Sequence, residues 1–510
     1  MIDTQFELEN VSPKPINHSN NRHASFPPFY SLPFNRNLES WWVLGKKDVL
    51  DFKNDFAKSG RRLWRAQFSA GHSIVGVVDI ATSKLINEPE SQRKTRNNRW
   101  NPSHTAYIAV AASRLSLQFL PSSSLAKSLV KDHMATCIYV SPKLDIMIAD
   151  YVSDPILALA ANFLRIKSQY DFSWETVLPR LIDEIKQGNV IEQSYRGELL
   201  ARVLLSMAWD DCCVNGNSVS SSIRPVSAQM FLTNLGSANL IEEMKKSKIP
   251  ETSLERLLNG YVFFTHFQPV TYSVKEQDLR NCFARSAAMI IKRGEVAIDL
   301  VIPILLKDDT MSYISVQVKN YSSEREPDSD LMLENGKLSK FEDVPYLAIV
   351  MNLGQSDESD HVEDNSSTDD DEFSQSSTFD SSQSSTVDED AQSFKQEETS
   401  QSTDLHHRKK LKLSAPESAD IVEEPFAEEQ MIGEPTLGTL IILNGLGEDT
   451  YSFLAKRSER SNIKEILTKF SACWVDPIMY DRETPFNSRF SLQSWFNKSY
   501  DWNDKKTFPK

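Results

Sequence analysis

The sequence predicts an α/β protein, with a helical N-terminal half that leads into a mixed β-sheet core. Three observations indicate this class. Apolar residues recur every three or four positions through 103–215, as on one face of a helix. Apolar runs of strand length occupy 298–319 and 344–354. Residues 355–432 almost lack aliphatic side chains, which predicts a long disordered acidic insertion within the fold.

Composition limits the class of protein. A chain of 510 residues exceeds one ordinary core and predicts two or three domains. The five cysteines are scattered without a CxxC spacing, which argues against a disulfide framework or a zinc site and favours a reducing compartment. The start "MIDTQFELEN" lacks the features of a secretory signal, and no apolar run approaches the roughly 20 residues that span a bilayer. We therefore expect a soluble intracellular protein without a membrane partner.

The net charge of -15 is unevenly distributed. Residues 355–430 carry about 22 acidic and 5 basic side chains, a local charge of about -17. The remainder of the chain is therefore at about +2, and the total charge does not exclude DNA or RNA as a partner.

The N-terminal quarter has two predicted parts. Residues 1–36 are rich in Pro, Asn and Ser without a period, which is typical of a disordered arm. Residues 37–150 form an N-terminal α/β region, in which "SIVGVVDIATSKLI" (73–86) is expected to be a short strand and a loop. The basic stretch 91–100 is either a solvated loop or a phosphate contact.

Residues 151–354 are predicted to hold a helical segment and the sheet core. "WETVLPRLIDEIKQG" and "YRGELLARVLLSMAWDDC" have helical spacing of apolar residues. The runs 298–319 and 344–354 supply strands. In residues 433–510, "GTLIILNGLGEDTYSFL" (438–454) predicts a strand, a loop and a helix, so this C-terminal α/β segment packs on the core or adds a strand to its sheet.

The acidic segment 355–432 has two predicted uses. It is a candidate region for binding protein partners. It also contains "HHRKKLKLS" (406–414), whose basic part 406–412 is either a nuclear-import signal or an ordinary solvated patch. The expected location is therefore the nucleus or the cytoplasm.

Polar residues at the ends of one predicted hairpin carry the functional prediction. In "IDLVIPILLKDDTMSYISVQVKN" (298–320), a turn centred on Asp308 places Asp299 opposite Gln317. Gln317 and Lys319 project from one face because they are two residues apart on a strand. A carboxylate, an amide oxygen and an ammonium then converge, which suits Mg²⁺ or Mn²⁺ held by Asp299 and Gln317. Lys319 could orient an attacking water and stabilise charge on a phosphate.

This arrangement resembles the PD-(D/E)XK superfamily, the restriction-endonuclease-like fold, in which an Asp starts one strand and Glu or Gln precedes Lys by two residues on the next. Asp299 and Gln317-Val318-Lys319 match the pattern. Two departures are present: Ile298 stands where the family usually has proline, and Gln317 carries no charge. The resemblance implies a nuclease-like sheet core and a metal-dependent hydrolase.

Many members of that superfamily place a further carboxylate on the helix before the hairpin. Glu198 in "YRGELLAR" is the preferred candidate, and Glu295 in "KRGEVAIDL" is the alternative. Residues 150–355 are also similar to a group of uncharacterised fungal proteins with this core. The predicted catalytic set is therefore Asp299, Gln317, Lys319 and Glu198.

Two functions follow from this reading. The first is a metal-dependent nucleic-acid phosphodiesterase, in intact or degenerate form, acting on DNA or RNA. The alternative is a non-catalytic intracellular interaction protein that retains the fold and binds partners through the acidic segment. In that case Asp299 caps a turn and Lys319 solvates a strand end. His266, after an apolar run, is interpreted as a satisfied core or turn histidine rather than a catalytic base.

Overall fold

The structure of the protein is a computed structural model. The structure describes residues 60–472 except 90–100, 141–145, 168–169, 192–196, 215–223, 238, 248, 271–272, 292–296, 320–328, 342, 354–436 and 459–461. All of them belong to one unit, formed by Met1–Asp357 and Glu434–Lys510. The predicted arm 1–36, the basic loop 91–100, Glu295 and the acidic segment with its basic run lie outside the described residues.

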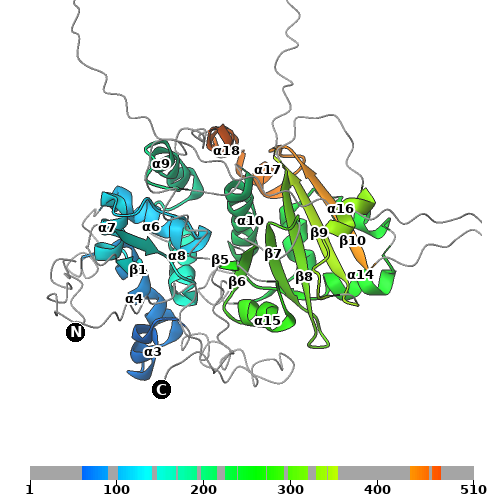
Figure 1. Ribbon diagram of the computed structural model, residues 1–510, viewed down its shortest axis with the longest axis horizontal. Helices are drawn as coiled ribbons and strands as arrows, with labels where there is room; N and C mark the ends of the chain where they lie inside the picture. The colour runs from blue at the N-terminus through cyan, green and yellow to red at the C-terminus, as the bar shows by residue number, and fades with distance from the viewer. Residues whose placement is uncertain are drawn as a thin grey trace, which may run out of the picture. The chain divides into compact units, whose positions relative to one another are not determined.

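The N-terminal part is mainly helical, as predicted (Figure 1). Helix α4 packs against α8, and α6 packs against both α8 and α9. A two-stranded antiparallel hairpin, which the sequence analysis missed, lies beside α7. The elements are α3 (Arg62–Ser69), α4 (Ile74–Ile86), α6 (His104–Leu115), α7 (Ser124–Asp132), β1 (Thr136–Val140), β2 (Met147–Asp150), α8 (Pro155–Lys167) and α9 (Trp174–Lys186).

The prediction of a strand over 73–86 is wrong, because this segment is helix α4. The Ser73 side chain caps the helix by accepting a hydrogen bond from the Gly76 N–H at 3.2 Å. The buried residues Ile74, Val77, Val78, Ala81 and Leu85 have the three- and four-residue spacing of a helix face. The β-branched residues of this stretch favoured a strand locally, but the cap and the packing surface offered by α8 outweigh that preference.

The sheet is mixed and larger than predicted. Its order is β10-β9-β8-β7-β4-β3, with β6 also pairing β7 and β5 pairing β6. The expected sheet over 296–354 therefore omitted four strands that lie between residues 226 and 291. The strands are β3 (Val226–Ser227), β4 (Tyr261–Val262), β5 (His266–Val270), β6 (Ala287–Ile291), β7 (Leu300–Leu305), β8 (Met311–Lys319), β9 (Tyr346–Asn352) and β10 (Gly438–Asn444).

Two predictions about this sheet are confirmed. The hairpin β7–β8 pairs Leu305 with Met311 and Leu300 with Val316, the register that a turn centred on Asp308 requires. The apolar run after the acidic segment forms β10, which adds to the sheet beside β9. Strands β8, β9 and β10 are parallel, so their carboxyl ends lie at the same end of the sheet.

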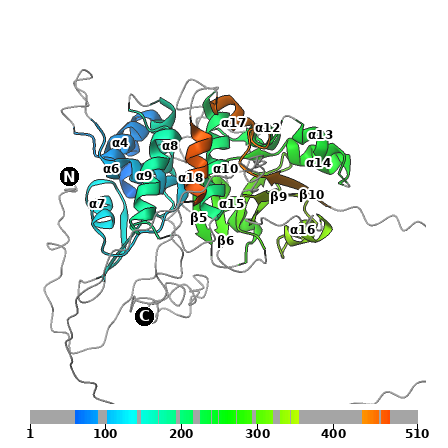
Figure 2. The same cartoon turned by 90° about the horizontal axis from the view of Figure 1, so that it is seen from above.

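Helices cover the sheet, and α10 lies between it and the N-terminal helices (Figure 1). Figure 2 shows α13 and α16 on opposite sides of β10, which both helices contact. No helix in the described part of the chain is long and apolar enough to cross a membrane. The helices are α10 (Gly197–Val214), α12 (Ala228–Leu235), α13 (Leu240–Lys245), α14 (Glu251–Leu258), α15 (Glu276–Ala284), α16 (Ser329–Asn335), α17 (Ser452–Ser458) and α18 (Ile463–Ala472).

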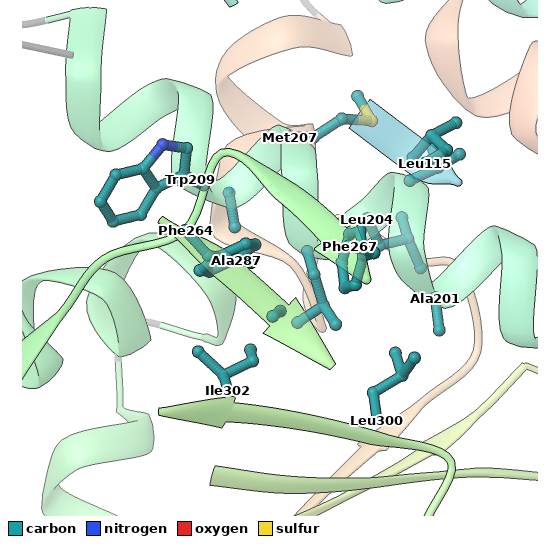
Figure 3. Close-up of a cluster of buried hydrophobic side chains, with 14 of the residues drawn as sticks. Leu115, Ala201, Leu204, Met207, Trp209, Phe264, Phe267, Ala287, Leu300 and Ile302 are labelled. Atoms are coloured by element: carbon teal, nitrogen blue, oxygen red, sulfur yellow. The ribbon is translucent and has the colours of Figure 1, made fainter. Parts of the chain in front are cut away.

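The central core forms where α10 meets the sheet (Figure 3). Trp209 of α10 packs on Phe264 with ring centroids 5.3 Å apart, and Phe264 packs on Phe267 at 5.8 Å. Figure 3 places Ala201 of α10 near Leu300 at the start of β7, and Ile302 farther along that strand. The N-terminal end of α10 therefore lies toward the end of the sheet at which β7 begins.

Candidate functional site

Asp299 stands immediately before β7 and is held from both neighbouring strands. Its backbone carbonyl accepts a hydrogen bond from the Ile291 N–H at 2.8 Å, and its own N–H donates to the Val316 carbonyl at 3.0 Å. Its half-buried carboxylate accepts the Val318 N–H at 2.7 Å through Oδ2. The carboxylate is thus fixed against the strand that carries Gln317 and Lys319.

Burial and the charge of Lys319 act on Asp299 in opposite directions. Burial raises the pKa of Asp299, and this effect outweighs the opposing effects of the Val318 N–H and the positive charge of Lys319. An ionised Asp299 is therefore costly in the folded protein, and a positive charge placed beside it would reduce that cost.

Gln317 and Lys319 are half-buried residues at the carboxyl end of β8. Two residues apart, they project from the same face of the strand, as expected. The Gln317 side chain makes no hydrogen bond to the described residues, so its amide oxygen is available to a ligand.

Glu198 lies in the first turn of α10 and is half-buried. It precedes Ala201 by three residues, so both are on the same side of the helix. Since Ala201 lies near Leu300 (Figure 3), we expect Glu198 to lie toward the end of the sheet that carries Asp299. Its approach to Asp299 itself remains a prediction.

Sequence reasoning missed the amides that continue this end of the sheet. Lys319 on β8 pairs with Asn352 on β9, which in turn pairs with Asn444 on β10. Polar residues therefore stand at the carboxyl ends of three adjacent parallel strands, a place where α/β sheets commonly bind ligands. The only available sequence feature was an Asn that ends each apolar run, because the parallel pairing depends on crossovers that a local pattern does not encode.

The described residues include no group of three or more His, Cys, Asp or Glu side chains that could hold a metal ion. The oxygen donors that the hairpin and strands β9 and β10 supply at this end of the sheet are instead the Asp299 carboxylate and uncharged amide oxygens. Such oxygen donors match the preference of Mg²⁺ and Mn²⁺, and not that of zinc or copper.

His266 lies at the start of β5 and is fully enclosed in a polar network. Its Nε2 is 2.7 Å from the Ser153 hydroxyl, and its Nδ1 is 3.2 Å from the Thr265 hydroxyl. The Arg285 Nε donates to the same Ser153 hydroxyl at 3.1 Å. Both ring nitrogens therefore have partners, which agrees with the interpretation of His266 as a satisfied core histidine.

We expect His266 to make the fold sensitive to acid. Burial, together with Arg285 and Arg114, lowers the pKa of His266 to about 3. The unfolded chain takes up a proton near pH 6.5 and the folded protein does not, so stability from this residue is complete above pH 6.5 and is lost as the pH falls toward 3. The loss between pH 7 and pH 5 should be about 2 kcal/mol.

Urea denaturation at both pH values tests this, with His266→Gln as the variant. The variant should lose less stability than the wild type over the interval, because it removes the titrating ring. His72→Gln, at an exposed position, is the control and should follow the wild type. Equal pH dependence in all three proteins would contradict the prediction.

Residues 98–358 match the family described as a domain of unknown function, DUF8736. The match spans just over half of the 510 residues, so the chain belongs to this family. It includes Glu198, Asp299, Gln317 and Lys319 and ends before β10. No curated protein and no solved structure matches the chain.

Proposed function

We propose that this member of the DUF8736 family is a metal-dependent phosphodiesterase of the PD-(D/E)XK type that acts on nucleic acid, with a restriction-endonuclease-like sheet. One observation carries the proposal: Asp299 starts one strand of a hairpin, and Gln317-Val318-Lys319 end its partner strand with Lys319 close enough to influence the Asp299 charge. The two strands that the family pattern requires are therefore adjacent and in register.

The residues present fit a hard divalent cation. Asp299 and Gln317 would hold Mg²⁺ or Mn²⁺ through a carboxylate and an amide oxygen. Burial disfavours the ionised form of this carboxylate despite the positive charge of Lys319, so a bound cation would offset the remaining cost. When bound, such a cation stabilises negative charge that develops on a phosphate.

The other roles belong to Lys319 and Glu198. The charge of Lys319 lowers the pKa of Asp299, and its ammonium would orient the attacking water or stabilise charge on the phosphate oxygens. Glu198, at the N-terminal end of α10, would act as an additional acid. The Val318 N–H holds Asp299 in place, leaving its second oxygen, Oδ1, for a ligand.

One observation favours the second function, a non-catalytic interaction protein. Gln317 replaces a carboxylate, and the single hairpin carboxylate already accepts a backbone hydrogen bond. If the protein is a non-catalytic interaction protein, this end of the sheet keeps its arrangement but does not catalyse hydrolysis.

Hydrolysis assays separate the two functions. Purified protein is incubated with plasmid, single-stranded DNA and RNA in Mg²⁺ or Mn²⁺. Lys319→Met should lower the rate at least about 100-fold, because a positioned charge at the reacting phosphate is removed. Lys307→Met, in the exposed turn of the same hairpin, is the matched control and should keep the wild-type rate. Equal background rates for the wild type and Lys319→Met on every substrate would exclude the enzyme.

A further inference from the structure

Asn352 has an uncommon environment at the end of β9. Its side-chain Oδ1 is buried and has no hydrogen-bond partner in the part of the chain that the structure describes. A buried polar atom without a partner costs about 1–3 kcal/mol, so most such atoms in folded proteins are paired. An acceptor in this state is ready to receive a hydrogen-bond donor or a cation.

The backbone around Asn352 is rigidly held. Its carbonyl accepts the Gly445 N–H at 2.8 Å, and the next residue, Leu353, donates to the Lys319 carbonyl at 2.8 Å. These hydrogen bonds fix the backbone of Asn352 between β8 and β10. A shift of β9 that would bring a hydrogen-bond donor to the Asn352 Oδ1 would break them. The register that pairs Asn352 with Lys319 also fixes the face of the sheet from which the Asn352 side chain projects.

This register places Asn352 beside the proposed cation site and outside its direct ligand shell. Asn352 lies two strands from Asp299, and adjacent strands are about 4.8 Å apart. Asp299 faces Gln317, which pairs with Val350, so Asn352 also lies two residues farther along β9. The resulting backbone separation of about 12 Å is too large for both side chains to ligate one Mg²⁺ directly at about 2.1 Å. It is within reach of the water shell, because Mg²⁺ retains several waters when few carboxylates bind it.

We propose that Asn352 is a positioning residue for the hydrated cation: its buried Oδ1 accepts a hydrogen bond from the water shell of an ion held by Asp299 and Gln317. This inference rests on the proposed cation site and extends it by one strand. It accounts for the unpaired acceptor, and it gives a site with one carboxylate a further group that recognises hydrated Mg²⁺.

Calorimetric binding of Mn²⁺ and of hexaamminecobalt(III) to the full chain tests the proposal. The cobalt complex cannot exchange its ligands, so it reports contacts to the outer shell alone. Asn352→Leu should weaken binding of both probes at least about fivefold. Asn352→Asp, which keeps an acceptor and adds charge, should bind both more tightly than the wild type does. Asn259→Leu, the same substitution at an exposed position directly after α14, should leave binding unchanged.

The outcomes separate the two proposals. Asn352→Leu should fold as well as the wild type, because it removes an unpaired acceptor, and urea denaturation checks this. Wild-type affinities in folded Asn352→Leu, together with weakened Mn²⁺ binding in Asp299→Asn, would overturn the role of Asn352 and leave the cation site standing. Absence of Mn²⁺ binding in the wild type would overturn both.

Discussion

Replacing Asp210 with Asn should destabilise the protein by about 3–5 kcal/mol. Asp210 of α10 is fully buried and holds two arginines. Its Oδ2 accepts from the Arg114 Nη1 at 2.8 Å and from the Trp174 Nε1 at 3.0 Å, and it forms an ion pair with Arg165. Burial alone would raise the pKa of Asp210, but the two arginines lower it below its ordinary value. The variant would remove the carboxylate that both buried arginines share.

Urea denaturation at pH 7 measures this loss. Asp211→Asn, at the next position of α10 and half-buried, is the matched control and should change stability by less than about 1 kcal/mol. A loss below 1 kcal/mol in Asp210→Asn would show that the two arginines do not depend on this carboxylate. A triple replacement of Arg114, Arg165 and Asp210 by apolar residues should cost less than Asp210→Asn, since no buried charge remains unpaired.

The Asp210 cluster also bears on the proposed site, because it anchors α10. Arg114 of α6 donates from its Nε to the Thr265 carbonyl at 3.0 Å, directly before β5. One side chain thus joins a helix of the N-terminal half to α10 and to the sheet. Since Glu198 begins the same helix, we expect Asp210→Asn to disturb the position of Glu198 as well as global stability.

The hairpin could be predicted because the residues that determine its register lie close together in the sequence. A short polar turn between two apolar runs sets the pairing of an antiparallel hairpin, so counting from Asp308 gave the observed register. The neighbours of that hairpin could not be predicted in this way. Pairing of β8 with β9 and of β9 with β10 depends on crossovers, and the partnership of Lys319 with Asn352 follows only from the assembled sheet.

Local sequence pattern gave wrong secondary-structure predictions where tertiary contacts determine the structure. The run 73–86 contains many β-branched residues but forms α4, because its apolar face fits against α8. The run 287–291, "AAMII", was not among the predicted strands, although it forms the buried strand β6 between β5 and β7. The buried Arg114–Asp210 pair had no signature in the sequence, because its members are 96 residues apart and meet only through helix packing.

Replacing Asp299 with Asn should stabilise the protein in the absence of divalent cations and remove its response to them. Asn keeps an oxygen that accepts the Val318 N–H, and it does not carry the buried charge whose ionisation is disfavoured. The expected gain at pH 7 is about 0.5–2 kcal/mol, the usual range for substitutions that relieve a functional cost.

A thermal-melt series with increasing Mn²⁺ tests both parts of this prediction. A cation that binds only the folded wild type adds about 2.7 kcal/mol at one hundred times its dissociation constant, enough to reverse the order of the two proteins. Asp343→Asn, at an exposed position before β9, is the control and should respond to Mn²⁺ as the wild type does. If Asp299→Asn were less stable without Mn²⁺, the carboxylate would be a structural cap, as the interaction-protein function requires. If Asp299→Asn is more stable than the wild type without Mn²⁺ and loses this advantage when Mn²⁺ is added, the Asp299 carboxylate serves to bind a cation.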